Sequence, residues 1–293
     1  MARWMTIAWL RLRSLFRASA ADRELDRELR FHLDARAEEL RAQGWTVARF
    51  GASVVGGAAG ERNVVSANEG VGVEINGPFA TQNRVLGNYI GTTHEGTGGA
   101  FTGNLSGGVL IRSARDNTIG GAAEGEGNLI GENEGRNPGD PPAHGVAVIG
   151  GSNNGIFGNR IGVGLAGEPL EIAGAGVYVE RSSGTSVGPS GSPAGANVIA
   201  FNAGAGVLIG ASPSEPGAVT YGNTVGINAI YGNRPGNAIH GMHGLGIDLG
   251  GDGVTANDAN DADDGPNRLT NRPVITEVLD EGSGYHVRLE MPA

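Results

Sequence analysis

The chain has 293 residues, of which 54 are Gly and only 5% are aromatic, so any core must be built from Val, Ile, Leu and Ala. It contains neither Cys nor Lys, which excludes disulfides, thiolate metal sites, Walker A phosphate loops and Schiff-base catalysis. Residues 1–50 hold ten Arg against seven acids, whereas residues 51–293 hold eleven Arg against twenty-four acids. The larger part should therefore repel nucleic acid, and we expect no nucleic-acid partner.

The first 44 residues differ in pattern from the rest. Residues 1–20 carry four Arg and no acid among apolar side chains, which suits either a poor export signal or a basic amphipathic helix that docks on a protein or a membrane surface. Residues 21–43 predict a helix, because Leu25, Leu29, Leu33 and Leu40 recur at helical spacing. No run of about 20 apolar residues occurs, so we predict no transmembrane segment.

The segment LRSLFRASAADRELDRELRFHLDARAEELRAQG (12–44) resembles the N-terminal prefix domain of a family of duplicated ABC-type permeases. The resemblance implies contact with a membrane transport system. The transmembrane helices and large extracytoplasmic domains that follow the prefix in that family have no counterpart after residue 44. Two interpretations stay open: a peripheral accessory of a transport system, or a reading frame that joins pieces of two unrelated genes.

From residue 51 onward the sequence repeats itself with a unit of 65–71 residues. Short β-branched runs bounded by Gly and Asn recur every 8–15 residues within each unit. Five elements recur: NVVSAN (63–68) with NLIGEN (128–133) and NVIAFN (197–202); NRVLGNYIG (83–91) with NGIFGNRIG (154–162) and NTVGINAIYGN (223–233); GVLI (108–111) with GVYV (176–179) and LGID (245–248); NTIGG (117–121) with TSVGP (185–189); and GVEI (72–75) with GVAV (145–148) and GVLI (206–209).

These repeats predict an all-β fold, a right-handed parallel β-helix over residues 51–278, preceded by the N-terminal α-helical segment. Three strands per coil of about 22 residues give roughly 11 coils, each pairing in parallel with its neighbours at about 4.8 Å. Residues 279–293 are expected to form a C-terminal strand or cap, or the start of a further domain.

Asn and Gly at the corners are explained by the positive φ that a tight corner requires. Asn at equivalent corners can also stack into amide ladders that join successive coils. We expect one ladder of Asn68, Asn133 and Asn202, and another of Asn88, Asn159 and Asn233. These Asn are interpreted as structural, not as ligand-binding residues.

The pattern NxIGG…GVxI…NxVxGNxIG, with GLGIDLGGDGVTANDANDADDGPN near its end, resembles secreted bacterial β-helix repeat proteins of the pectin-lyase-like superfamily over residues 51–278. The resemblance implies an extracellular or cell-surface location. It also implies that acidic polysaccharides can be ligands or substrates, because some members bind or cleave them. Of the polygalacturonase motifs only a DD pair is present, at Asp263 and Asp264, and the RIK motif is impossible without Lys.

An Asp-rich stretch near the C-terminus is the strongest candidate for chemistry. Clustered carboxylates repel one another unless a cation joins them, and calcium takes 6–8 oxygen ligands. We therefore consider a calcium site as the alternative to a solvated loop, although the spacing fits neither the EF-hand nor the nonapeptide repeat. The candidate ligands are Asp248, Asp252, Asp258, Asp261, Asp263 and Asp264.

Other motifs are weaker. GTSVG (184–188) matches the nucleophile elbow around Ser186, but that motif needs a strand–turn–helix in an α/β sheet. His240 and His243 form a close pair without a third metal ligand, while His94, His144 and His286 are isolated. Arg112, Arg160 and Arg181 near strand ends are read as solvated side chains. We assign no catalytic residue.

The leading expectation is a non-enzymatic β-helix repeat protein, secreted or surface-associated, that binds glycan or protein along a lateral face. The enzymatic alternative is a polysaccharide lyase or hydrolase, which would need convergent charged residues on one sheet. The third reading is the transport accessory, for which the N-terminal helix would touch a membrane surface or a partner.

Overall fold

The computed structural model describes residues 53–57, 61–135, 142–210, 220–234, 244–260, 264–282 and 284–290. The chain divides into two units, Met1–Phe50 and Gly51–Ala293, and all described residues belong to the second. The helical segment predicted within residues 1–44 therefore lies outside the described residues.

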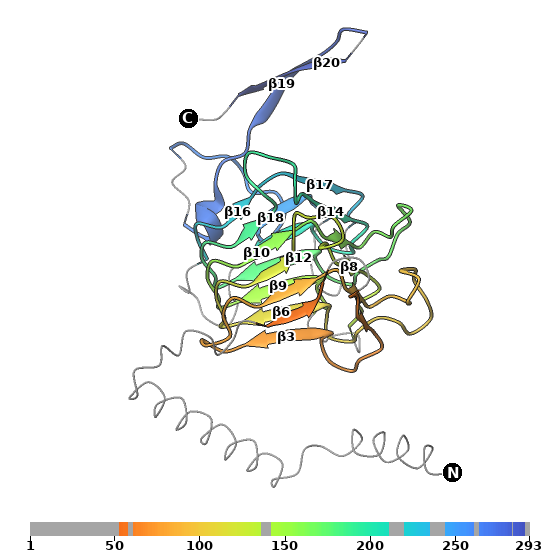
Figure 1. Cartoon of the computed structure of the whole chain (residues 1–293). Coiled ribbons are helices and arrows are strands. Elements are labelled where there is room, and N and C mark those ends of the chain that lie inside the picture. Colours follow the sequence, from red (N-terminus) through yellow and green to blue (C-terminus); the bar gives the residue numbers. More distant parts are fainter. Residues whose placement is uncertain are drawn as a thin grey trace, which may run out of the picture. The chain divides into compact units, whose positions relative to one another are not determined.

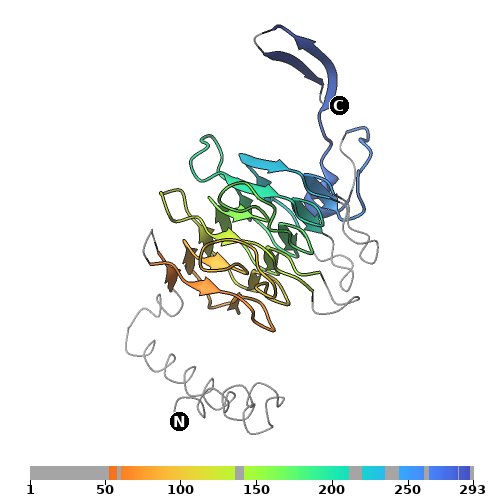
Figure 2. The same cartoon turned by 90° about the vertical axis from the view of Figure 1, so that its right-hand side faces the viewer.

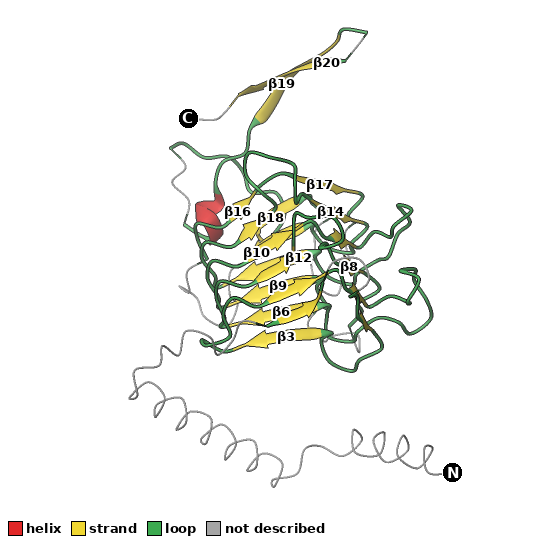
Figure 3. Ribbon diagram, in the orientation of Figure 1, coloured by secondary structure: helices red, strands yellow, loops and turns green. Residues whose placement is uncertain are grey.

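The described part is a parallel β-solenoid with three six-stranded sheets, in which each strand pairs with the strands three places away in the chain (Figures 1 and 3). Sheet A consists of β1 (Val54–Gly56), β4 (Arg84–Leu86), β7 (Thr118–Gly120), β10 (Gly155–Phe157), β13 (Ser186–Val187) and β16 (Thr224–Val225). Sheet B consists of β2 (Val64–Val65), β5 (Tyr89–Ile90), β8 (Leu129–Ile130), β11 (Arg160–Ile161), β14 (Asn197–Ala200) and β17 (Asn228–Tyr231). Sheet C consists of β3 (Val73–Asn76), β6 (Val109–Arg112), β9 (Val146–Ile149), β12 (Val177–Glu180), β15 (Val207–Gly210) and β18 (Ile247–Gly250).

The parallel three-sheet architecture confirms the predicted fold class, but the prediction of roughly 11 coils is wrong. Five full turns separate the first strand of each sheet from its sixth, and Figure 2 shows the strands stacked in chain order. Paired residues in adjacent turns lie 25 residues apart between Val64 and Tyr89 and 40 apart between Tyr89 and Leu129. A turn is thus longer than the expected 22 residues, because connecting loops of unequal length separate the strands. The 65–71-residue unit spans two turns, not three.

The core is a stack of β-branched side chains that point inward from all three sheets. Sheet B contributes one column, in which Ile90, Ile130, Ile161 and Ile199 are fully buried. Sheets A and C contribute similar columns, and together they form one continuous cluster. Such a narrow interior leaves no room for aromatic rings, and Tyr89 packs in a separate cluster with Leu129 and Leu170. The low aromatic content of the sequence follows from this geometry.

Glycines of the GVxI motif form a column at the corner that leads into sheet C. At Gly108 a Cβ atom would lie 2.5 Å from the carbonyl oxygen of Gly145, and at Gly145 it would lie 2.5 Å from that of Gly176. Contacts this close exclude any side chain, so these glycines are required by the distance between turns and not by a positive φ.

Three ladders of Asn side chains join the turns, one at each corner of the solenoid. In each ladder the main-chain N–H and the Nδ2–H of one Asn donate to Oδ1 of the Asn one turn later. In the A–B ladder, for example, Asn128 donates to Oδ1 of Asn159 from N at 3.1 Å and from Nδ2 at 2.8 Å. The A–B ladder comprises Asn63, Asn88, Asn128, Asn159, Asn197 and Asn228.

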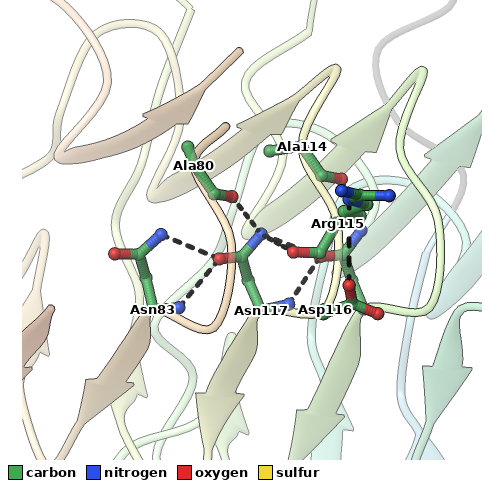
Figure 4. A network of polar contacts seen from close by, with 7 residues as sticks. Ala80, Asn83, Ala114, Arg115, Asp116 and Asn117 are labelled. Atoms are coloured by element: carbon green, nitrogen blue, oxygen red, sulfur yellow. Dashed lines mark hydrogen bonds and ion pairs between the residues drawn. The ribbon is translucent and has the colours of Figure 1, made fainter. Parts of the chain in front are cut away.

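The other two ladders are each interrupted once. The B–C ladder comprises Asn68, Asn104 and Asn133, then Asn202 and Asn233. The C–A ladder comprises Asn83, Asn117 and Asn154, then Asn223 and Asn267. Figure 4 shows Asn83 donating to Asn117, whose Nδ2 also donates to the carbonyl oxygens of Ala80 and Arg115.

The structure thus separates the Asn residues that the sequence grouped. Asn68, Asn133 and Asn202 all lie in the B–C ladder, and Asn88 and Asn159 lie in the A–B ladder. Asn233 hydrogen-bonds with Asn202, so it belongs to the B–C ladder and not with Asn88 and Asn159. Positive φ mostly occurs at the residue before the ladder Asn, as at Gly87, Glu132 and Phe201, and among the ladder Asn residues Asn267 alone has a positive φ itself.

A 3-10 helix, η2 (Pro266–Leu269), and an antiparallel hairpin follow the last turn. The hairpin consists of β19 (Val274–Asp280) and β20 (Tyr285–Glu290), so the predicted boundary between residues 278 and 279 falls inside β19. Its register places five apolar side chains on one face, all of them exposed: Ile275, Val278, Tyr285, Val287 and Leu289.

Candidate functional site

The Asp-rich stretch does not form one cluster in its described part. Asp248 is buried on β18, where its Oδ1 accepts the N–H of Gly251 at 3.1 Å. The main-chain N–H of Asp258 donates to Oδ1 of Asn271 at 2.9 Å, while Asp252 and Asp264 are exposed. Asp261 and Asp263 lie outside the described residues. Among the side chains that the structure describes, no three His, Asp or Glu are placed to hold a metal ion.

The remaining candidates have structural surroundings or are exposed. Ser186 lies on β13, paired between Gly155 and Thr224, so the strand–turn–helix of a nucleophile elbow is absent there. Nε of Arg160 donates to the carbonyl oxygen of Gly164 at 2.9 Å, and Nε of Arg112 lies 3.9 Å from Oε1 of Glu74.

The isolated histidines divide into exposed and packed ones. His94 lies beside Glu95 at 2.7 Å in an exposed loop, and His286 is exposed on β20. His240 and His243 lie outside the described residues. His144 alone of the described histidines packs against another ring.

The structure brings together a group of side chains that the sequence kept apart, on the outer face of sheet C. This group, the β12 cluster, consists of His144, Tyr178, Glu180 and Arg181. The rings of His144 and Tyr178 are stacked, with centroids 4.5 Å apart and planes inclined by 24°. The hydroxyl of Tyr178 donates to Oε2 of Glu180 at 2.8 Å, and Oε1 of Glu180 lies 3.3 Å from Nε of Arg181.

The strand pairing explains how the cluster forms. Val177 and Val179 point into the core, so Tyr178 and Glu180 point outward from the same strand. In the adjacent turns Ala147 and Leu208 lie opposite Tyr178, and Ile149 and Gly210 lie opposite Glu180. A Cβ on Gly210 would lie 2.8 Å from Cε2 of Tyr178, so Gly210 makes room for the ring.

The protonation of the cluster follows from its partial burial. Burial lowers the pKa of His144 to about 4. Its Nδ1 accepts the N–H of Ala175 at 3.0 Å, a bond that requires this nitrogen to carry no proton. Burial, followed by the hydrogen bond to Glu180, raises the pKa of Tyr178. At neutral pH the cluster therefore presents a neutral imidazole, a neutral phenol and an ion pair.

Chemically this arrangement can bind a ligand. Aromatic rings beside a carboxylate and a guanidinium offer an apolar surface together with directed hydrogen bonds.

A second charged group lies along the B–C corner. Burial, and then the charges of Glu134 and Glu171, raise the pKa of Glu132. Glu171 forms an ion pair with Arg234. These residues flank ladder positions, and they contain no aromatic ring.

The part of the chain that the structure describes contains no helix with the length and apolar character to cross a membrane. No protein-family model, no curated protein and no solved structure matches the chain.

Proposed function

We propose that the chain is a non-enzymatic β-helix repeat protein, exported or surface-associated, that binds glycan along the outer face of sheet C. The observation that carries the proposal is the β12 cluster, in which stacked His144 and Tyr178 lie beside the Glu180–Arg181 ion pair. In this proposal the solenoid is right-handed, as parallel crossover connections almost always are, and related to the pectin-lyase-like superfamily.

The charge of the chain bears on which glycan is bound. Residues 51–293 carry eleven Arg against twenty-four acids, and such a surface repels polyanions at low ionic strength. Neutral polysaccharides pay no such penalty and can stack a sugar ring on an aromatic face. The expected ligand is therefore a neutral glycan, and a polyuronate serves as the contrasting probe.

The test is calorimetry of the full chain with soluble laminarin, xyloglucan and arabinogalactan, and with polygalacturonate. At least one neutral glycan should bind, and Tyr178→Leu should weaken that binding at least about tenfold, equivalent to ~1.4 kcal/mol. Tyr285→Ala is the control, because Tyr285 is an exposed tyrosine on the β20 hairpin and not on sheet C. Equal binding by the Tyr178→Leu and Tyr285→Ala variants would remove the β12 cluster as the binding site.

Glu180→Gln provides a second variant that keeps the packing of the cluster. The amide oxygen of Gln can still accept the Tyr178 hydroxyl, but the ion pair with Arg181 is lost. A drop in affinity with an unchanged unfolding temperature would assign the effect to binding and not to folding.

A further inference from the structure

The two ladder interruptions lie on the same turn, and they flank a single strand. Every strand of sheet C lies between one position of the B–C ladder and one position of the C–A ladder. For β9 these positions hold Asn133 and Asn154, and for β15 they hold Asn202 and Asn223. For β12 they hold Ile172 and Thr185.

The main-chain hydrogen bonds identify these two residues as the ladder positions. The N–H of Ala173 donates to the carbonyl oxygen of Asn133, as the N–H of Glu134 donates to that of Asn104 one turn earlier. The N–H of Thr185 donates to Oδ1 of Asn223 at 2.9 Å, as a ladder Asn would. At Thr185 only the side chain breaks the pattern, whereas at Ile172 the main-chain N–H bond to Oδ1 of Asn202 is missing as well.

The interruptions leave polar atoms without partners. Both Oδ1 of Asn202 and Oγ1 of Thr185 are buried. The amide oxygen of Asn202 accepts no hydrogen bond, and the hydroxyl of Thr185 neither accepts nor donates one. The side chain of Ile172 is hydrocarbon and cannot donate to Oδ1 of Asn202. The hydroxyl of Thr185 makes no hydrogen bond with Asn154. Buried polar groups are almost always paired, and a buried group without a partner lowers stability. Both corners beside β12 are therefore less firmly joined than the corners of the neighbouring turns.

Other side chains connect β12 with β9 instead. Nδ1 of His144 accepts the N–H of Ala175 just before β12. Just after β12, Oγ of Ser182 accepts the N–H of Gly151 at 3.1 Å. The hydroxyl of Ser182 also lies within hydrogen-bond distance of two carbonyl oxygens, 3.2 Å from that of Val148 on β9 and 2.8 Å from that of Glu180. These bonds go to several different atoms, whereas each ladder step provides two bonds to one oxygen.

We infer that β12 is the least firmly held inner strand of sheet C and that a glycan bound at the β12 cluster holds it in place. The strand that is flanked by both ladder interruptions is also the strand that carries Tyr178 and Glu180, and it leads directly into Arg181. A ligand that contacts these side chains only when β12 is hydrogen-bonded between β9 and β15 stabilises that state by its binding free energy. The second half of this inference rests on the proposed function.

Hydrogen exchange of the full chain, followed by mass spectrometry, tests the inference. Without ligand, the amides of β12 should exchange about tenfold faster than those of β9 and β15, the factor expected for the loss of one or two net hydrogen bonds. Saturation with the glycan that binds best in calorimetry should slow exchange in β12 more than in β9 or β15.

Thr185→Asn should restore one ladder and slow exchange in β12 without ligand. Thr224→Asn is the matched control, since Thr224 is exposed on β16 and outside the ladders. Ile172→Asn is the less direct variant, because it also removes a fully buried aliphatic side chain.

The outcomes separate the two claims. Equal exchange rates in β9, β12 and β15 without ligand would overturn the inference that β12 is less firmly held, whether or not a glycan binds. Glycan binding that leaves β12 exchange unchanged would overturn the coupling. Absence of any glycan binding would overturn the proposed function and the coupling together, while the loosened strand is judged by the free protein alone.

Discussion

Oδ1 of Asn159 accepts two hydrogen bonds from Asn128, while Nδ2 of Asn159 donates to Oδ1 of Asn197 at 3.0 Å and to the carbonyl oxygen of Ile119 at 2.9 Å. One buried side chain thus connects three successive turns. Asn159→Ala should lower the free energy of unfolding by about 3 kcal/mol, because several buried groups lose their partner. Chemical denaturation measures this loss. Asn76→Ala, at an exposed position on β3, should change it by less than about 0.5 kcal/mol.

Gly145 lies where two turns come closest, at the corner leading into β9. A Cβ there would be 2.5 Å from the carbonyl oxygen of Gly176 and 2.6 Å from Cγ2 of Ile161. Gly145→Ala should therefore destabilise the fold by about 2–3 kcal/mol through overpacking, which thermal unfolding can measure. Gly70→Ala is the control, since nothing lies within 4 Å of a Cβ at Gly70. Similar unfolding temperatures for both variants would contradict the close approach of the turns.

His144 should make stability depend on pH. Its pKa is about 4 in the folded chain and 6.5 in the unfolded chain, so the unfolded chain binds more protons between these values. This stability is fully present above about pH 6.5 and is lost as the pH falls towards 4. The expected loss between pH 7 and pH 5 is about 2 kcal/mol.

Unfolding curves at pH 7 and pH 5 check the role of His144. His144→Gln keeps a hydrogen-bond acceptor for Ala175 but cannot titrate, so its stability should change less over this range. His94→Gln should retain the pH dependence of the parent, because His94 is exposed. Identical profiles for the two variants would exclude His144 as the origin of the effect.

The hairpin of β19 and β20 presents its apolar face to solvent, since Val278 is 56% and Val287 is 46% exposed. Its other face carries an ion pair between Glu277 and Arg288 at 3.0 Å. Val287→Asp should reduce the fluorescence of a hydrophobic dye and leave the main unfolding transition within about 1 °C. His286→Asp, on the opposite face, replaces one polar side chain by another and should leave both unchanged. A large drop in the unfolding temperature with Val287→Asp would show that this face stabilises the solenoid.

The repeated elements were sufficient to predict a parallel three-sheet solenoid, because inward Val and Ile recur between Gly and Asn at every turn. They were not sufficient to count the turns. Asn68 and Asn104 are 36 residues apart, and Asn104 and Asn133 are 29 apart, although each pair spans one turn. The loops between strands vary in length, and the same pattern of loops recurs only at every second turn. Alternate turns therefore resemble each other in sequence more than adjacent turns do. The third and fifth sequence elements are therefore one strand position of sheet C, seen in alternate turns.

Asn233 was placed in the wrong ladder for a related reason. Alignment of NTVGINAIYGN with NRVLGNYIG matches the second Asn of each segment, and the residue equivalent to Asn88 is then Asn228 and not Asn233. Asn197 donates a hydrogen bond to Asn228, and Asn202 donates one to Asn233. These two bonds distinguish the two corners.

The β12 cluster was missed because its members are distant in sequence. His144 precedes β9 and Tyr178 lies on β12, so only the register between turns brings their rings together. Matching GVAV (145–148) with GVYV (176–179) as adjacent strands would have placed Tyr178 beside Ala147. Even then, the stacking depends on side-chain packing that no sequence spacing specifies.

The two-turn repeat sets the increment by which such a molecule can change its length. One repeat of two turns adds about 10 Å of length at the parallel-strand spacing. After each repeat the same kinds of loop and corner residue recur at all three corners. Insertion or removal of one whole repeat would therefore keep each Asn facing its donor, whereas a single turn would join unlike loops. Chains that differ only in the number of whole repeats would therefore differ in length by steps of about 10 Å.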